Sequence, residues 1–185
     1  MDSTATRADI AGAVGDGVVQ LAIFKVGNEK YGVYIQDVRE VTRYYPITRV
    51  PKVPKFIEGV INLRGTIIPV VDMRKRFDLD GIVPTRKTRI IIISAEGKIV
   101  GLMVDEAREV TRIPKGEIMP PPKIIKGIES EYIQAVTKVG EDLVVILDFA
   151  KVLSTEERIR LDETEAVKVS RKKTRPAPKG PGKKR

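Results

Sequence analysis

The residue types in this chain that could do chemistry favour binding over catalysis. The sequence contains no Cys, His or Trp, which excludes thiolate nucleophiles, imidazole bases and Cys/His metal sites. Acidic residues are numerous, but no pair of them sits on a recognisable catalytic framework. The Gly-rich stretch at residues 12–17 lacks a preceding strand and the Lys-Ser/Thr ending of a phosphate loop. We therefore expect no enzymatic activity, no cofactor and no metal.

Arg64 is a candidate anchor for a binding partner. It stands beside Gly65 within residues 59–72, a segment that is almost wholly apolar. One interpretation is structural: residues 62–65 form a turn, and Arg64 is its solvent-facing tip. The other is functional: a guanidinium held on a rigid apolar surface can bind a partner through bidentate hydrogen bonds. The residue type alone leaves both interpretations open.

Glu40 and Glu109 occupy matching places in a repeated sequence. Residues 32–43 read GVYIQDVREVTR and residues 101–112, 69 positions later, read GLMVDEAREVTR. Each glutamate could simply balance the arginines that flank it, and exposed pairs of this kind contribute little stability. We favour that interpretation for Glu109. For Glu40 we hypothesise an ion pair with Arg64, whose NLRG segment has no equivalent in the second copy.

The repeat also predicts the elements that must position these residues. Alternating apolar runs around a turn at residues 19–35, and again at residues 90–104, predict two β-hairpins with Gly27 and Gly97 in their turns. After each hairpin, apolar residues recur at a spacing of three, which favours a single helical turn.

Further strands and short helices are expected beyond the hairpins. Apolar runs predict strands near residues 60–63, 66–72 and 142–148. Asp72 and Asp148 end their strands and can cap the short helices that follow.

We expect an all-β fold with internal duplication. The arrangement predicted is two small β-barrel subdomains of about five short strands each, with short helices, at about residues 18–83 and 84–153. A helix at about residues 154–163 would complete a body that runs from 18 to 165. Each subdomain is too small to be stable alone, so apolar surface should be buried between them.

The two ends of the chain differ from this body in composition. Residues 1–17 are small and polar, and we expect a disordered tail. Residues 166–185 hold nine Lys/Arg and no acid, which leaves 25 basic and 25 acidic residues elsewhere. The net charge of +9 therefore belongs to a basic tail that we also expect to be disordered. The abundance of charged residues favours a thermophilic source.

Several ordered motifs resemble the CheW-like family of chemotaxis coupling proteins. They are FKVGNEKYGVYIQDVREV, FIEGVINLRGTIIPVVDMRKRF, VGLMVDEAREV and LVVILD, and the resemblance spans roughly residues 18–161. FIEGVINLRG-x-IIPVVD is its most specific part. The resemblance implies two SH3-like barrels around a shared core and no catalysis.

The same resemblance implies a function and a set of partners. Such proteins are cytoplasmic adaptors that couple the cytoplasmic tips of methyl-accepting chemoreceptors to the regulatory domain of the histidine kinase CheA. They work in receptor arrays at the inner face of the membrane, where CheW–CheW contacts are also possible. It implies no membrane insertion and no specific nucleic acid.

The resemblance also implies which residues bind these partners. Arg64 matches the arginine of the family's NLRG motif, and Gly59 and Glu40 stand at positions that the family uses for receptor or kinase binding. Val38 and Val110, in the two predicted helical turns, would be apolar contacts near the seam between the barrels.

An alternative function is binding to nucleic acid or to an anionic surface through the basic tail. Small β-barrels and a cluster of Lys/Arg are compatible with it. Against it, the body is neutral and carries only four Phe and five Tyr, which leaves few stacking platforms.

Overall fold

The computed structural model describes residues 17–95, 97–122 and 132–152. Most of the expected N-terminal tail, the expected helix at residues 154–163 and the basic tail lie outside these residues. The strands are β1 (Val18–Val26), β2 (Glu29–Tyr34), β3 (Val38–Arg43), β4 (Ile57–Leu63), β5 (Thr66–Asp72), β6 (Arg89–Ala95), β7 (Lys98–Val104), β8 (Glu106–Pro114), β9 (Ile133–Val139) and β10 (Asp142–Leu147). The short helical segments are η1 (Ile35–Asp37), α1 (Met73–Arg76), η2 (Lys115–Glu117) and α2 (Phe149–Val152).

The two predicted hairpins are confirmed. β1 pairs antiparallel with β2 and β6 pairs antiparallel with β7, and Gly27 and Gly97 both have positive φ in the turns. Residues 90–93 of β6 are four consecutive isoleucines, each 1% exposed or less. Burial of both faces explains why this strand reads as a continuous apolar run rather than an alternating one.

The predicted helical turns after the hairpins are largely wrong. In the first copy only Ile35–Asp37 is helical, as η1, and the chain then runs as β3; in the second copy residues 106–114 are the strand β8. Exposure along β3 alternates strictly, with Val38 half-buried and Val41 46% exposed. The three-residue apolar spacing therefore reflects the two faces of a strand. With the 69-residue offset, the counterpart of Val110 is Val41 and not Val38.

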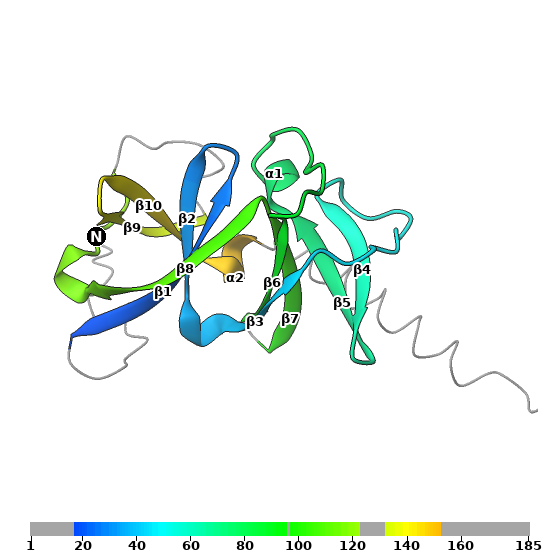
Figure 1. The fold of residues 1–185 in the computed structure, drawn as a ribbon, viewed down its shortest axis with the longest axis horizontal. Helices are drawn as coiled ribbons and strands as arrows, with labels where there is room; N and C mark the ends of the chain where they lie inside the picture. Colours follow the sequence, from blue (N-terminus) through cyan, green and yellow to red (C-terminus); the bar gives the residue numbers. More distant parts are fainter. Residues whose placement is uncertain (1–16, 96, 123–131, 153–185) are drawn as a thin grey trace, which may run out of the picture. The chain divides into compact units, whose positions relative to one another are not determined.

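The strands form two five-stranded sheets that exchange hairpins between the copies of the repeat. Sheet A has the order β8-β1-β2-β10-β9, and sheet B has the order β3-β6-β7-β5-β4. The first copy supplies β1–β5 and the second supplies β6–β10, so the two orders are the same once the copies are interchanged. Figure 1 shows the blue β1–β2 hairpin between β8 and the olive strands β9 and β10. The predicted boundary between residues 83 and 84 therefore separates the two copies of the repeat. It does not separate the two sheets, because each sheet contains strands from both copies.

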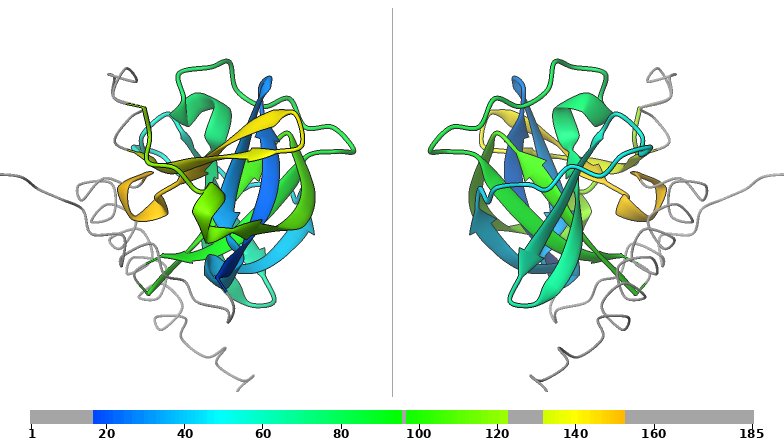
Figure 2. Two further views of the ribbon diagram at one scale, coloured as in Figure 1. Left: turned by 90° about the vertical axis from the view of Figure 1, so that its left-hand side faces the viewer. Right: turned by 90° about the vertical axis from the view of Figure 1, so that its right-hand side faces the viewer.

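Each sheet encloses its own apolar cluster. Sheet A contributes Leu21, Tyr34 and Ile146, among others, and sheet B contributes Ile68, Ile90 and Met103, among others. The opposite faces of the exchanged hairpins are also buried, since β1 contacts β7 and β6 contacts β8. The side views in Figure 2 show the blue hairpin lying among the green and yellow strands of the second copy.

Isolated bridges connect the two edge strands of each sheet. Thr48, which follows β3, pairs with Val60 of β4, and Met119, which follows β8, pairs with Val136 of β9. The chain leaving one edge strand therefore reaches the other edge, as expected for a small curved sheet. Two SH3-like five-stranded sheets with short helices confirm the predicted fold class.

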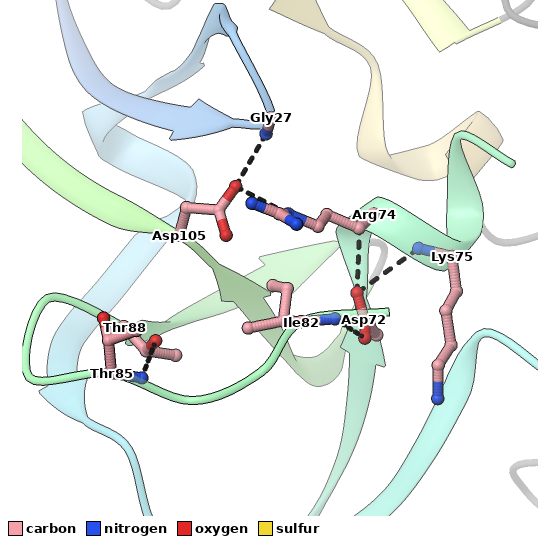
Figure 3. A network of polar contacts seen from close by, with 8 residues as sticks. All are labelled: Gly27, Asp72, Arg74, Lys75, Ile82, Thr85, Thr88 and Asp105. Carbon is pink, nitrogen blue, oxygen red and sulfur yellow. Dashed lines mark hydrogen bonds and ion pairs between the residues drawn. The ribbon is translucent and has the colours of Figure 1, made fainter. Parts of the chain in front are cut away.

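Asp72 and Asp148 cap the helices that follow their strands, as predicted. Asp72 is fully buried, and its Oδ1 accepts hydrogen bonds from the backbone N–H groups of Arg74 at 2.9 Å and Lys75 at 3.3 Å. Its Oδ2 accepts a third from Ile82 at 2.9 Å, which fixes the loop after α1 (Figure 3). Burial raises the pKa of Asp72, opposed by these hydrogen bonds.

Substitution of Asp72 should separate its capping role from its loop contact. Asp72→Ala leaves three backbone donors without an acceptor, and we expect a loss of about 2–4 kcal/mol in the free energy of unfolding. Asp72→Asn keeps the capping oxygen and loses only the bond to Ile82, so a loss of about 1–2 kcal/mol is expected. Urea unfolding of the two variants measures both values, and equal losses would contradict the separate roles.

Candidate partner-binding site

The turn between β4 and β5 holds Arg64 at its tip. Leu63 pairs with Thr66, so Arg64 and Gly65 form a two-residue turn. Both have positive φ, 51° and 87°, as in a type I′ turn, and Asn62 Oδ1 accepts a hydrogen bond from Gly65 N at 2.8 Å. A left-handed conformation costs a side chain such as that of Arg64 about 1–2 kcal/mol. The stability of the turn therefore does not explain why an arginine occupies this position.

The structure confirms the hypothesised ion pair between Glu40 and Arg64. Nη1 of Arg64 lies 3.0 Å from Oε2 of Glu40, and Nη2 donates to Oε1 at 3.3 Å. The pair connects β3 and the β4–β5 turn, from opposite edges of sheet B. Because the Arg64 side chain is 78% exposed, the pair adds only about 0–1 kcal/mol of stability. Its main physical effect is to orient the guanidinium, which keeps three further N–H donors for other acceptors.

Gly59 lies in the same sheet as Arg64 but is buried. Its φ is +148°, and a Cβ atom built on it would lie 2.2 Å from the carbonyl oxygen of Thr48. Thr48 and Val60 exchange two backbone hydrogen bonds of 2.9 Å at this place. The close approach of the two backbones therefore requires glycine, and a larger residue would push the segment at Thr48 away from β4.

The two valines expected near the seam lie in different sheets. Val38 is half-buried on β3 of sheet B, whereas Val110 is 54% exposed on β8 of sheet A. Val41, the counterpart of Val110, is also exposed. The structure therefore brings Glu40 and Arg64 into contact, and it places Val110 on the opposite sheet.

A polar contact between the two sheets was not predicted from the sequence. Asp105, between β7 and β8, accepts hydrogen bonds from the backbone N–H of Gly27 at 2.6 Å and from Nε of Arg74 at 2.9 Å. Figure 3 shows this carboxylate between the β1–β2 turn and α1. A comparison of the two copies of the repeat could have indicated this contact. The acidic Asp105 stands where the first copy has Gln36, and the basic Arg74 stands where the second copy has Ala150.

Aromatic contacts at the seam were also missed. The guanidinium carbon of Arg76 lies 4.3 Å from the ring centre of Phe56 and 4.7 Å from that of Tyr132. Its Nη2 donates to the Tyr132 hydroxyl at 2.8 Å. Tyr31 of β2 stacks on Phe77, with ring centres 5.0 Å apart. These contacts join residues of sheet A to the segments that flank β4 and β5.

Two acidic residues, Asp37 of η1 and Asp148 after β10, lie close enough for their charges to interact. Burial raises the pKa of Asp37, and the nearby Asp148 carboxylate raises it further. The hydroxyl of Tyr34 is buried without a hydrogen-bond partner in the described part of the chain. Its pKa is raised by burial and by the charge of Asp37. The ionised form of Asp37 is therefore less favourable in the folded protein than in the unfolded chain.

The described residues contain no group of three or more acidic, His or Cys side chains placed to hold a metal ion. Within the same residues, no helix combines the length and the apolar character needed to cross a membrane.

Comparison with known proteins gives a consistent result. A family model described as the CheW-like domain matches residues 20–157. The chain is 34% identical over 163 residues to the chemotaxis protein CheW of Klebsiella aerogenes, covering 88% of this chain and 96% of that protein. It is 36% identical over 137 residues to the chemotaxis protein CheW of Bacillus subtilis, covering 74% and 88%. The crystal structure of the scaffolding protein TtCheW from Thermoanaerobacter tengcongensis matches with a TM-score of 0.70 and 35% identity, covering 75% of this chain and 94% of that one.

Two SH3-like sheets built from one repeat, with an exposed arginine held on a turn, define an all-β scaffold. The chain belongs to the CheW-like domain family of chemotaxis proteins. It is a chemotaxis scaffold of the adaptor type and not an enzyme.

The strain at Arg64 can be measured once its ion pair is removed. In a Glu40→Gln background, Arg64→Asn replaces arginine by the residue that type I′ turns prefer. We expect a gain of about 0.5–1 kcal/mol in the free energy of unfolding. In the wild-type background the gain should be smaller, because the substitution also removes the pair. Chemical denaturation of the four proteins measures both effects, and a loss of stability in the Glu40→Gln background would show that the turn is unstrained.

Asp37 should make stability depend on pH. Its carboxyl group binds a proton more tightly in the folded state than in the unfolded chain, where its pKa is near 3.8. Its contribution to stability is therefore present below pH 3.8 and is lost as the pH rises through the raised folded-state pKa. Asp37→Asn removes this loss, so its Tm relative to the wild type should be higher at pH 7 than at pH 3. A difference in Tm that is the same at both pH values would contradict this assignment.

Proposed function

We propose that this protein couples chemoreceptors to the histidine kinase CheA. In this role it binds the cytoplasmic tips of methyl-accepting chemotaxis proteins and the regulatory domain of CheA within a receptor array. It is then located in the cytoplasm, at the inner face of the membrane through those complexes. Membership of the CheW-like family supports the proposal, and contacts between copies of the protein in the array are compatible with it.

The observation that carries the proposal is the exposed, oriented guanidinium of Arg64. The turn places it in a strained conformation, and Glu40 holds it through two contacts. Strain that a fold retains without a stability gain is typical of functional positions. The free N–H donors are directed from a turn that β4 and β5 support, so binding a partner requires little ordering of the side chain.

The chemistry of this site suits a protein partner. An arginine among apolar residues is a frequent hot spot in protein interfaces, because it combines charged hydrogen bonds with a broad apolar stem. A receptor tip is built from helices, whose side-chain carboxylates and exposed C-terminal carbonyls are acceptors for a guanidinium. Gly59, on the strand that leads to this turn, allows the backbone at Thr48 to approach β4 closely.

The proposal predicts that Arg64→Ala weakens receptor binding about tenfold or more, as expected when an interface hot spot is removed. The measurement is a pull-down and a titration with a receptor cytoplasmic fragment, with and without CheA. Arg49→Ala is the matched control, since Arg49 is 87% exposed and lies 3.9 Å from the carboxylate of Glu58 at the other end of β4. We expect this control to bind as the wild type does.

The outcomes distinguish the function from the site. If the wild-type protein bound neither the receptor fragment nor CheA, the coupling function would be rejected. If the wild type bound both and Arg64→Ala bound equally well, the function would stand and the assignment of Arg64 would be wrong.

A further inference from the structure

A second surface, independent of the Arg64 turn, is a groove rich in arginine at one end of sheet B. It has a volume of about 810 Å³, and its lining includes Arg43, Tyr44, Pro84, Arg86 and Arg89. Its lining contains three guanidinium groups and no acidic residue. Glu40 and Arg43 are three residues apart on a strand, so their side chains leave opposite faces of β3. The groove is therefore distinct from the Glu40–Arg64 pair.

Two of the arginines face each other directly across two strands. Arg43 is the register partner of Arg89 in the pairing of β3 with β6. Like charges that stand directly opposite each other on neighbouring strands destabilise a sheet. No carboxylate of the described residues forms an ion pair with Arg43, Arg86 or Arg89, so nothing in that part of the chain neutralises them. The nearby Glu106 pairs instead with Lys87 and Arg108.

The second copy of the repeat shows that the fold does not need this pair. In the pairing of β8 with β1, Arg112 faces Gln20. With the 69-residue offset, Arg112 is the counterpart of Arg43, and Gln20 is the counterpart of Arg89. The same place in the same fold therefore carries a cation opposite an amide in sheet A and a cation opposite a cation in sheet B.

The wall of the groove is held by the chain's own hydrogen bonds. Thr85 N donates to Thr88 Oγ1 at 2.8 Å, and Ile82 N is bound by Asp72 (Figure 3). Nη1 of Arg89 donates to the carbonyl oxygens of Arg86 at 2.7 Å and Thr88 at 2.9 Å. This guanidinium is consequently fixed against the loop before any ligand arrives.

We propose that this groove binds an acidic peptide segment of a protein partner. Carboxylates match the planar donors of the three arginines and would relieve the repulsion between Arg43 and Arg89. Tyr44, which is 38% exposed, and Pro84 offer apolar surface for the side chains between the carboxylates. The groove is larger than a single small anion fills, and one tyrosine is too few for the successive base stacking that single-stranded nucleic acid requires.

Binding can be tested on the full chain with a short fluorescein-labelled peptide of glutamate and leucine residues. Fluorescence anisotropy should show saturable binding that weakens as the salt concentration rises. The same peptide with glutamine in place of glutamate should not bind. Arg43→Gln and Arg89→Gln should each weaken binding about tenfold, as expected for the loss of one charge-assisted contact. Arg112→Gln, the equivalent change in the second copy, should leave binding unchanged.

Thermal unfolding supplies an independent measurement. Without peptide at low salt, Arg43→Gln should raise the Tm by about 1–3 °C, because it removes the like-charge pair. The Arg43 side chain forms no hydrogen bond with the described residues, so this variant loses none. Arg112→Gln should leave the Tm unchanged. The peptide should raise the Tm of the wild type more than that of Arg43→Gln.

Three results would overturn the proposal. They are peptide binding that is unaffected by both groove variants, equal binding of the glutamine peptide, and tighter binding of pyrophosphate or single-stranded DNA than of the acidic peptide. None of them bears on receptor or CheA binding through Arg64, so this proposal and the coupling function fail independently.

Discussion

The exchange of hairpins between the two copies of the repeat is the constraint on which the rest of the structure depends. β1 and β2 complete the sheet of the second copy, and β6 and β7 complete the sheet of the first. The junctions between the copies are the antiparallel pairs of β1 with β8 and of β3 with β6, and the parallel pairs of β2 with β10 and of β5 with β7. Neither copy can satisfy its backbone hydrogen bonds alone. The seam between the sheets is therefore crossed by the chain itself, and polar contacts such as that of Asp105 with Arg74 position the elements rather than hold two domains together.

A fold built from two equivalent copies separates structural residues from candidate functional ones. Asp72 and Asp148 cap helices in both copies, which marks capping as a requirement of the fold. Arg64 has no counterpart in the second copy, and Arg89 is replaced there by Gln20. Both arginines carry an energetic cost, since one has a left-handed backbone and the other faces a like charge. Costs that one copy avoids and the other retains are what binding sites are expected to show.

Hairpins and helix caps were predicted correctly from the sequence, whereas the segments after the hairpins and the long-range pairing of the strands were not. Hairpin turns and capping aspartates depend on neighbouring residues, so they could be predicted from the pattern. The contact of Glu40 with Arg64 could be hypothesised because the two side chains carry opposite charges and because the NLRG segment that holds Arg64 has no equivalent in the second copy of the repeat. The pairing of β3 with β6 could not, because the apolar spacing of three indicated a helical turn where β3 lies, and because the pattern of a strand does not identify its neighbour. For the same reason, the approach of Gly27 to Asp105 and of Arg43 to Arg89 was visible only in the structure.

The hairpin exchange also orders the assembly of the protein as it is synthesised. Every strand of sheet B lies within residues 38–104, whereas sheet A combines residues 18–34 with residues 106–147. A chain growing from its N-terminus makes β1 and β2 first, yet their partners β8, β9 and β10 are the last strands to emerge. Sheet B can close while this first hairpin still exposes the apolar side chains of Leu21 and Phe24. The nascent chain therefore carries an apolar hairpin without its strand partners until β8, β9 and β10 emerge, and completion of sheet A is the step that removes this exposure.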